Sequence, residues 1–256
     1  MVALEELANG TNRASVVSAD GNLIGGFAQG SFSRTPAIWD GTTAGQLLDP
    51  PSGDALGEVH GVSDDGTILL GTWLTDETAH RAVKWTYPGL VREMVGDGSL
   101  LPGWEGIPFD IADDGTIVGF DFLVGNRQAW IALPSPGPQR STTCTMVSIV
   151  SFVESNGGEV PEGFLPQVCQ AISADGRKII GHSGFPSPGA FLITRCPEDV
   201  DGDGEVGVTD FLALLAVWGT CADCQTPFAC PADVNGDCEV DVVDFLAILS
   251  AWGPCP

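Results

Sequence analysis

The segment VVSADGNLIGGF, residues 16–27, places a polar Ser-Ala-Asp-Gly turn between two short apolar stretches. Asp and Gly tolerate the positive φ angles of tight hairpin turns, so the segment predicts two antiparallel strands joined at Asp20 and Gly21. The pattern returns as GVSDDGTILLGTW (61–73), DIADDGTIVGF (110–120) and AISADGRKIIGH (171–182). Four copies in one chain indicate a repeat architecture.

A short apolar strand follows each turn after a polar loop. These strands are PAIWD (36–40), RAVKW (81–85), QAWIAL (128–133) and GAFLIT (189–194). A weaker fourth segment, such as GQLL (45–48) or LVREMV (90–95), brings each unit to about four strands. The turn glycines at 21, 66, 115 and 176 are 45, 49 and 61 residues apart, a spacing typical of propeller blades. We therefore predict that residues 1–195 form a mainly β, propeller-like array of about four four-stranded repeats.

The two ends of this array predict how it closes. The fourth unit stops at Arg195, directly before Cys196, without a fourth strand of its own. The chain begins with a strand-like segment, VALEEL (2–7). We expect residues 2–7 to pair beside residues 190–195 and close the ring, because pairing would cover two exposed sheet edges.

The charge of the chain limits its partners. Ten Lys and Arg stand against 34 Asp and Glu, a net charge of -24, which disfavours nucleic acid and anionic lipid and favours cations. No apolar run approaches the roughly 20 residues of a transmembrane helix. Six of the eight cysteines lie in the last 61 residues, a density typical of oxidising compartments. We expect an extracellular or cell-surface location, although the first ten residues show no export signal.

Two acidic segments, DVDGDGEVGVTD (199–210) and DVNGDCEVDVVD (233–244), share one spelling. A calcium-binding loop directs oxygens at positions 1, 3, 5, 7, 9 and 12 onto one ion. Both segments carry oxygen-bearing side chains at positions 1, 3, 5, 7 and 12, and the second also carries one at position 9. Hard oxygen donors without His or thiolate favour Ca²⁺, so we predict two ions, one in each loop. The predicted ligands are Asp199, Asp201, Asp203, Glu205 and Asp210 in the first loop, and Asp233, Asn235, Asp237, Glu239, Asp241 and Asp244 in the second.

Each loop precedes a predicted helix, FLALLAVWG (211–219) and FLAILSAWG (245–253), and both helices end at Gly. No helix is expected before either loop, because Pro197 and Pro231 stand there. Both helices are apolar nearly all round. One face can pack helix on helix, and the rest would contact the β-domain, a partner or another copy. Alternatively, all of this apolar surface is internal core.

Two family resemblances follow from these motifs. Residues 14–195 resemble the HAF-type repeats of bacterial extracellular proteins, without the His of their Ala-Phe strand. Residues 196–256 resemble type I dockerins, and the flanking CP and WG pairs make this module similar to the GC-type dockerin-like group. The second resemblance implies two antiparallel helices, one calcium ion per loop and docking onto a cohesin-like partner.

The module departs from the dockerin pattern at several loop positions. Position 6 of the second loop is Cys238, where Gly normally bends the chain, and position 9 of the first loop is Gly207, which has no side-chain oxygen. Positions 10 and 11 carry no Ser-Thr pair. They are Val208 and Thr209 in the first loop and Val242 and Val243 in the second. A cellulosomal partner is therefore not expected.

Antiparallel helices, as the resemblance implies, bring opposite helix ends together and so indicate a disulfide scheme. The expected pairs are Cys196 with Cys255, Cys221 with Cys230, Cys224 with Cys238, and Cys144 with Cys169. The CADC segment (221–224) also allows a redox or zinc site, but it lacks a thioredoxin-like or zinc-finger context.

The β-repeats carry no recognisable catalytic motif. None of the three histidines, His60, His80 and His182, lies in a known catalytic sequence motif. The acidic pairs Asp64–Asp65 and Asp113–Asp114 resemble a glycosidase pair, but the second Asp of each is the turn residue that every repeat shares. Two tryptophans, Trp73 and Trp104, could stack on sugar rings if exposed, whereas Trp39, Trp85 and Trp130 fall on the recurring strand and are expected in the core.

These observations predict a secreted or cell-surface, non-catalytic scaffold or adhesion protein. Its residues 196–256 would mediate calcium-dependent anchoring to a cohesin-like or other cell-surface protein. The alternative is a carbohydrate-binding or polysaccharide-degrading component of an extracellular complex, since dockerins usually accompany such activities.

Overall fold

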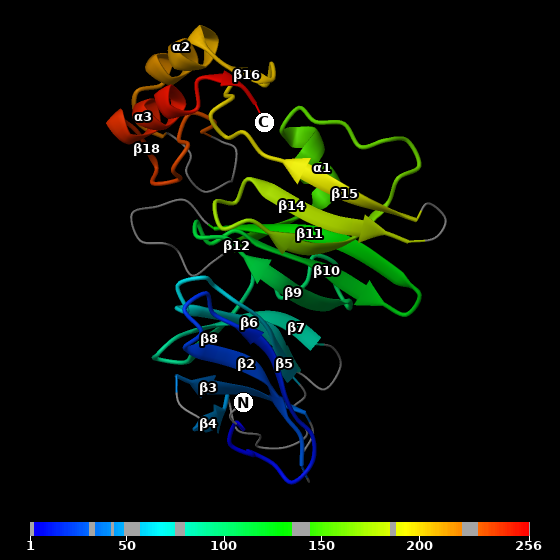
Figure 1. Cartoon of the computed structure of the whole chain (residues 1–256). Coiled ribbons are helices and arrows are strands. Elements are labelled where there is room, and N and C mark those ends of the chain that lie inside the picture. Colours follow the sequence, from blue (N-terminus) through cyan, green and yellow to red (C-terminus); the bar gives the residue numbers. More distant parts are fainter. Residues whose placement is uncertain are drawn as a thin grey trace.

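The computed structural model describes residues 3–30, 34–41, 44–48, 57–74, 80–134, 144–184, 188–221 and 230–255. Four antiparallel sheets follow one another along the chain, and a small module with two helices follows the last sheet. Figure 1 shows the sheets stacked in chain order, from the blue first sheet to the yellow fourth sheet, with the module at the far end of the stack. The predicted mainly β array of four successive antiparallel sheets is thus confirmed, although the fourth sheet has three strands.

Three of the sheets have four strands in sequence order. The first comprises β1 (Asn12–Val17), β2 (Leu23–Ala28), β3 (Thr35–Asp40) and β4 (Gly45–Leu47). The second comprises β5 (Gly57–Val62), β6 (Ile68–Leu74), β7 (His80–Thr86) and β8 (Val91–Met94). The third comprises β9 (Glu105–Ile111), β10 (Ile117–Leu123), β11 (Asn126–Pro134) and β12 (Cys144–Ser148), and α1 (Ile149–Ser155) follows it.

The fourth sheet has three strands, β13 (Pro166–Ile172), β14 (Lys178–Ser183) and β15 (Gly189–Thr194). The module then contains β16 (Glu205–Val206), α2 (Val208–Ala216), β17 (Gly219–Thr220), β18 (Glu239–Val240), α3 (Val242–Ser250) and β19 (Gly253–Pro254). Within the described ranges, no helix is long and apolar enough to cross a membrane.

The Asp-Gly turns form as the sequence predicts. The turn glycines 21, 66, 115 and 176 have φ angles of 77°, 69°, 89° and 70°, in the left-handed region that glycine tolerates. In the first turn the Asp20 carboxylate accepts hydrogen bonds from the Ser18 hydroxyl (2.6 Å) and the Asn22 N–H (2.9 Å). The equivalent Asp of each other copy accepts the N–H group two residues later in the same way. These bonds run from residues 67, 116 and 177 to Asp65, Asp114 and Asp175.

A second glycine in each repeat has a role that the pattern alone did not reveal. The first strand of every sheet has a register shift opposite the middle of the second strand. There a Cβ on Gly71 would lie 2.2 Å from the Glu58 carbonyl oxygen, and one on Gly181 would lie 2.1 Å from that of Val168. Only glycine allows this approach, so the aliphatic-Gly pair of the repeat marks a β-bulge.

The sheets stack through their first strands. Strand β5 packs against the first sheet, β9 against the second, and β13 against the third. Trp39, Trp85 and Trp130 are fully buried, as predicted for the recurring strand. Trp73 is also buried, and the Arg92 guanidinium lies 4.4 Å from the centre of its ring, so Trp73 is not exposed for the sugar stacking that the sequence suggested. Trp104 is half-buried.

The predicted ring closure is wrong. Residues 3–8 form no strand and lie on the first sheet, where Leu4 and Leu7 pack against Trp39. The Trp39 indole donates a hydrogen bond of 3.0 Å to the Glu5 carbonyl. Apolar contact with the buried Trp39 face outweighs edge pairing, so this segment covers the start of the stack instead of joining β15.

The expected Cys144–Cys169 disulfide is also wrong. Both thiols are free and buried, Cys144 in the core near Trp130 and Cys169 in the core between the third and fourth sheets. Burial raises the pKa of Cys169 to about 12, so the group stays a neutral thiol. Each cysteine acts as a small apolar residue of its own core cluster.

Asp121 on β10 gives a test of this core. Its side chain is fully buried and accepts the Leu101 N–H at 2.8 Å, and burial raises its pKa to about 6 from an ordinary 3.8. The folded state therefore disfavours the charged carboxylate. The free energy of unfolding that the protonated Asp121 contributes below pH 3.8 is lost as the pH rises through 6. We expect Asp121→Asn to become more stable than the parent chain by up to roughly 3 kcal/mol between pH 4 and pH 8.

Urea unfolding across this pH range, at constant calcium, measures the difference between the two chains. Taking the difference cancels the other titrating groups, including His60, whose pKa burial lowers. A difference that does not change with pH would contradict the assignment to Asp121.

Candidate metal centre in the C-terminal module

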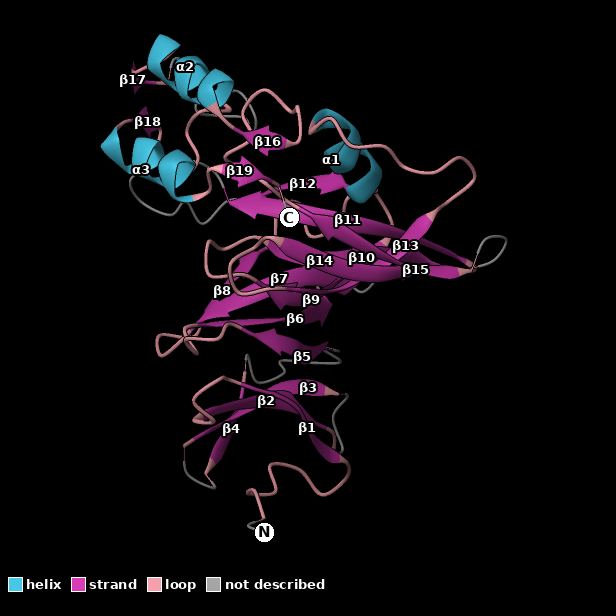
Figure 2. Cartoon of the chain, turned by 45° about the horizontal axis from the view of Figure 1, so that its top comes forward, coloured by secondary structure: helices cyan, strands magenta, loops and turns pink. Residues whose placement is uncertain are grey.

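The module has an approximate two-fold repeat. Strand β16, which precedes α2, pairs with β19, which follows α3, and β18 before α3 pairs with β17 after α2. Each helix therefore starts where the other ends, so the two helices are antiparallel. They also touch through Phe211 and Phe245, whose ring centres are 5.5 Å apart. Figure 2 shows α2 and α3 side by side above the β-sheets.

Two disulfides follow the same symmetry. Cys196 is joined to Cys255 with a Cα separation of 5.9 Å, and Cys221 is joined to Cys230 at 6.1 Å. Each bond links the residue three positions before an acidic loop to the residue five positions after the end of the opposite helix. Both predicted pairs are confirmed. Cys238 is disulfide-bonded as well, whereas Cys224 lies outside the described residues.

The first acidic loop folds around the carboxylate of Asp199. Its Oδ1 accepts N–H groups from Gly202 (2.8 Å) and Asp203 (3.1 Å), and its Oδ2 accepts that of Gly204 (2.9 Å). Asp203 in turn accepts the Glu205 N–H at 2.9 Å. These bonds curl residues 199–205 into a compact turn whose remaining oxygen lone pairs stay free for a ligand.

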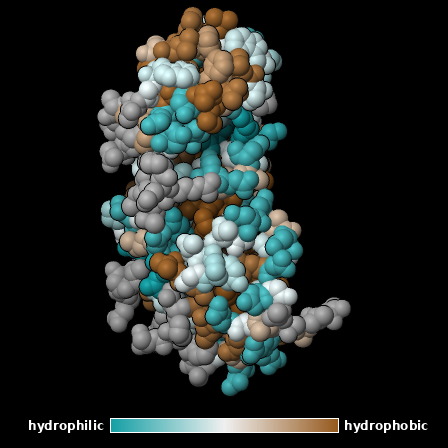
Figure 3. Space-filling view, turned by 90° about the vertical axis from the view of Figure 1, so that its left-hand side faces the viewer, coloured by the Kyte–Doolittle hydropathy of each residue, from teal (hydrophilic) through white to brown (hydrophobic). Residues whose placement is uncertain are grey.

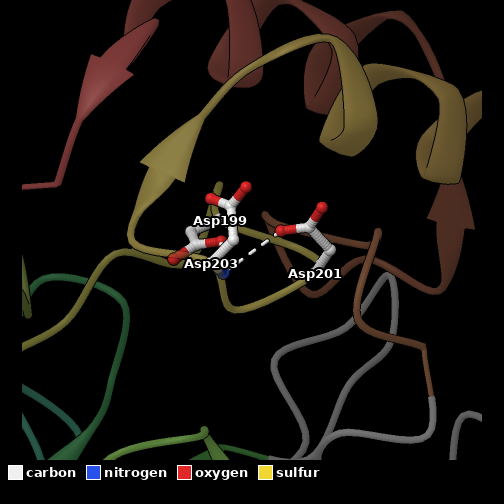
Figure 4. A group of neighbouring side chains, drawn as sticks. All are labelled: Asp199, Asp201 and Asp203. Carbon is white, nitrogen blue, oxygen red and sulfur yellow. Dashed lines mark hydrogen bonds between the residues drawn. The ribbon is translucent and has the colours of Figure 1, made fainter.

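The structure brings three predicted ligands of this loop together. Carboxylate oxygens of Asp199, Asp201 and Asp203 lie within 4.8 Å of one another, close enough to share a single ion. Figure 4 shows the three side chains in one turn ahead of the helix. Such a set of hard oxygen donors suits Ca²⁺ better than zinc or copper.

Asp210, at position 12, has a different observed role. It is fully buried at the start of α2, where Oδ1 accepts the N–H groups of Val200 (2.7 Å) and Asp201 (3.2 Å). Its Oδ2 accepts the Gly207 N–H at 2.6 Å. The carboxylate thus ties both ends of the loop to the helix start, where the helix dipole favours negative charge.

The second loop repeats this network bond for bond. Asp233 accepts Gly236 (2.8 Å), Asp237 (3.1 Å) and Cys238 (2.9 Å) through their N–H groups. Asp244 is fully buried and accepts the N–H groups of residues 234, 235 and 241. Two copies of one hydrogen-bond network, differing in sequence, indicate that the loop shape itself is required.

The two sequence departures have clear structural outcomes. Cys238 adopts φ +74°, in the same left-handed region as its counterpart Gly204 at +89°, so the bend forms without glycine. Asp241 caps α3 by accepting the Val243 N–H at 2.7 Å. Gly207 occupies the corresponding position before α2 and has no side chain to do so.

The remaining predicted ligands are less specifically placed. Glu205 and Glu239 have exposed side chains at loop position 7. Asn235 donates a side-chain hydrogen bond of 3.1 Å to Asp237 and accepts its N–H at 2.8 Å. Partial burial raises the pKa of Asp233, with the nearby Asp244 charge as a smaller cause. Among the Asp, Glu, His and Cys side chains of the described ranges, Asp199, Asp201 and Asp203 form the one such cluster, and in the second loop Asn235 replaces the middle carboxylate.

An ion pair joins this module to the last sheet, a feature the motifs did not predict. Glu198 is 2% exposed and receives both terminal nitrogens of the Arg177 guanidinium, one of them at 3.0 Å. Arg177 directly follows the fourth turn glycine, and Glu198 directly precedes Asp199. The bidentate pair therefore fixes the first acidic loop next to the fourth Asp-Gly turn.

The candidate residues of the β-domain have structural partners. His60 lies near Thr72, and the pair Asp64–Asp65 belongs to a turn in which Asp65 accepts the Thr67 N–H at 2.9 Å. His80 lies 3.2 Å from the Glu105 carboxylate. Asp114 accepts the Thr116 N–H at 2.7 Å in the corresponding turn. The turn interpretation of the acidic pairs therefore agrees with the structure.

Comparison with known proteins gives the fold alone. No family model matches the sequence, and no curated protein matches it. The chain is similar to a solved structure of putative TolB from Agrobacterium tumefaciens, with a TM-score of 0.51 and 16% identity, covering 78% of this chain and 65% of that chain. TolB from Acinetobacter baumannii aligns with a TM-score of 0.46 and 14% identity over 72% of this chain and 41% of that one. The first likeness supports a propeller-like β architecture.

The two disulfides differ in the length of chain they enclose, which allows a matched test. Sequence separations of 59 and 9 residues predict, by loop entropy, contributions of about 4 and about 3 kcal/mol. We expect Cys196→Ser/Cys255→Ser to destabilise the module more than Cys221→Ser/Cys230→Ser does. Urea unfolding followed by circular dichroism at 222 nm measures both pairs. Equal or reversed losses would mean that native-state contacts, and not loop closure, set their contribution.

Proposed function

We propose that this chain is an extracellular or cell-surface scaffold or adhesion protein without catalytic activity. Its C-terminal module binds two calcium ions and docks onto a protein partner, as its resemblance to dockerins implies. The observation that carries the proposal is the duplicated loop network, in which Asp199 and Asp233 each organise a turn through three backbone N–H groups.

The charge balance of the module supports a role for calcium. Residues 196–256 contain twelve acidic residues and no basic one. Within the described residues, the one ion pair that involves the module uses Arg177 of the β-domain. Backbone N–H groups satisfy individual oxygens, but they leave the net negative charge in place. Two bound divalent cations would lower that self-repulsion and link metal binding to folding.

An apolar surface on the two helices supports docking. Val208, Leu212 and Leu215 lie at helical spacing on α2, with exposed fractions of 60%, 56% and 45%. The counterparts on α3 are Val242, Leu246 and Leu249, at 54%, 56% and 45%. Trp218 and Trp252 follow the helices, half exposed. We call these eight residues the helical apolar face, and Figure 3 shows hydrophobic residues gathered at this end of the molecule.

Such a face fits a protein partner better than solvent. Exposed apolar side chains of this size, gathered on one small module, mark interaction sites, and tryptophans are frequent energetic centres of interfaces. A cohesin-like domain is the partner that the resemblance implies, and another cell-surface protein fits the same chemistry. Disulfides within the module agree with an oxidising environment.

A carbohydrate-binding or polysaccharide-degrading role is the second candidate. It rests on what dockerins usually accompany and on Trp104, which is half-buried in the β-domain. Asp65 and Asp114 are engaged in turns, so this role has less structural support than scaffolding. Turnover of a polysaccharide panel, abolished by a carboxylate substitution outside residues 196–256, would favour it over the first proposal.

Calcium titration of the full chain tests the metal sites. We expect two ions to bind, with dissociation constants of about 10⁻⁴ to 10⁻³ M, the range of extracellular modules. Asp201→Asn should remove one ion, because this exposed side chain belongs to the three-carboxylate cluster and is not needed for the core. Isothermal titration calorimetry measures the number of ions bound. Asp64→Asn, an exposed turn Asp outside the loops, is the matched control, and an unchanged stoichiometry in Asp201→Asn would refute the first site.

Binding to a panel of purified cohesin-like domains tests the docking face. Leu212→Glu combined with Leu246→Glu should weaken binding at least tenfold, since two carboxylates would enter an apolar contact. Leu123→Glu is the control, because Leu123 is a comparably exposed apolar residue on β10, at 43%. Surface plasmon resonance in calcium and in chelator provides the measurement. Binding that survives both chelator and the double substitution would contradict calcium-dependent docking through this face.

A further inference from the structure

Strand β15 differs from the strands that hold the same place in the other sheets. In the first three sheets the third strand pairs on both sides, with β4, β8 or β12 as its outer neighbour. Its central residues are buried there, as Ala37, Ala82 and Ala129 illustrate. The corresponding Ala190 is exposed, and no residue of β15 is buried. The recurring Ala-aromatic strand therefore has an outer neighbouring strand in the first three sheets and none in the described part of the fourth.

The outer edge of β15 has no hydrogen-bond partner in the described part of the chain. Its ladder bonds go to β14 alone, and no other backbone or side-chain bond there involves residues 189–194. Figure 1 shows β15, in yellow, as the last strand before the module. The free edge thus exposes a row of N–H and C=O groups that can pair with another strand.

This edge also lacks the features by which proteins usually block such pairing. The strand GAFLIT (189–194) contains no charged residue and no proline, and its register with β14 runs without a bulge. Leu192 is 60% exposed and lies opposite Ile180, which is 49% exposed. An apolar edge without charge, proline or bulge is a template for an added strand.

We propose that β15 pairs with β15 of a second copy of this chain, antiparallel about a two-fold axis, so that two three-stranded sheets become one of six strands. Each β15 then has the outer neighbour that β3, β7 and β11 have in their own sheets. An antiparallel pair of identical strands is self-complementary, which is the requirement for a closed dimer.

Charge favours a second copy at this position over other contacts between copies. The chain carries a net charge of -24, so most of its surfaces repel one another. Strand β15 is uncharged, and the exposed residues of β14 beside it are Lys178, Ile180 and His182, with no carboxylate among them. Two copies can therefore pair through this edge without placing acidic side chains of β14 or β15 opposite each other. Half-buried Phe191 and Ile193 would gain cover on the other side of the sheet.

Sedimentation velocity of the full chain in calcium, from 1 to 100 µM, tests the proposal. We expect a species of twice the 26.6 kDa chain mass at the higher concentrations. The combined change Ala190→Glu/Leu192→Glu should weaken dimerisation at least tenfold, because it brings four carboxylates to the shared edge of an antiparallel pair. Both side chains are exposed in the single chain, so the fold should survive.

Two control variants identify the surface involved. Ile180→Glu lies on the same sheet face but one strand away from the edge, and Leu215→Glu lies on the helical apolar face. Neither should change the dimer. Equal loss with Ile180→Glu would show face-to-face stacking, loss with Leu215→Glu alone would show pairing through the module, and a monomer at 100 µM would show no self-association. Each of these three outcomes would overturn the proposal.

Hydrogen exchange adds a readout specific to strand pairing. The outward N–H groups of residues 189–194 should exchange more slowly at concentrations where the dimer forms, and the Ala190→Glu/Leu192→Glu chain should lose this protection. A dimer whose β15 amides exchange as fast as those of the monomer would contradict edge pairing.

Discussion

The close approach of two backbones inside each sheet is the constraint on which the rest of the β-domain depends. Near the bulge of each first strand, a carbonyl oxygen approaches a glycine of the second strand. A Cβ added to Gly71 or Gly181 would lie only 2.2 or 2.1 Å from that oxygen. The bulge twists the first strand, and this strand is the one that packs on the preceding sheet. One glycine per repeat therefore allows the stacking that buries Trp39, Trp85 and Trp130.

The C-terminal module depends on other interactions, because it has little apolar interior. Among the module residues that the structure describes, the buried apolar core consists of Val206, Leu214, Ala232, Val240 and Ile248. At about 1.5–3 kcal/mol for each large side chain, this burial is small against the entropy of ordering some 60 residues. The disulfides Cys196–Cys255 and Cys221–Cys230, and the backbone N–H groups bound by Asp210 and Asp244, therefore contribute a large share of the stability of the module.

Local chemistry made much of this predictable from sequence. The Asp-Gly turns follow from the positive φ that Gly21 and its counterparts adopt. The antiparallel helices and the two disulfides were expected through the resemblance of residues 196–256 to dockerins. What the sequence did not reveal depends on long-range packing. Leu4 and Leu7 lie in a strand-like sequence pattern, but they pack against Trp39 of the first sheet and form no strand. Cys144 and Cys169 completed an even count of cysteines, yet they lie in separate core clusters.

The Arg177–Glu198 ion pair connects the β-domain to the C-terminal module. Glu198 is almost fully buried and so depends on the bidentate guanidinium for its charge, since leaving it unpaired would cost several kcal/mol. Because Glu198 adjoins Asp199, the orientation of the first acidic loop is set by the fourth Asp-Gly turn. The second loop has buried Ala232 at this position and no such tie. The two loops are thus alike in hydrogen bonding, but only the first follows a residue that forms an ion pair with the β-domain in the described part of the chain. A partner that docks on the helical apolar face would therefore contact two helices whose preceding loops differ in this attachment.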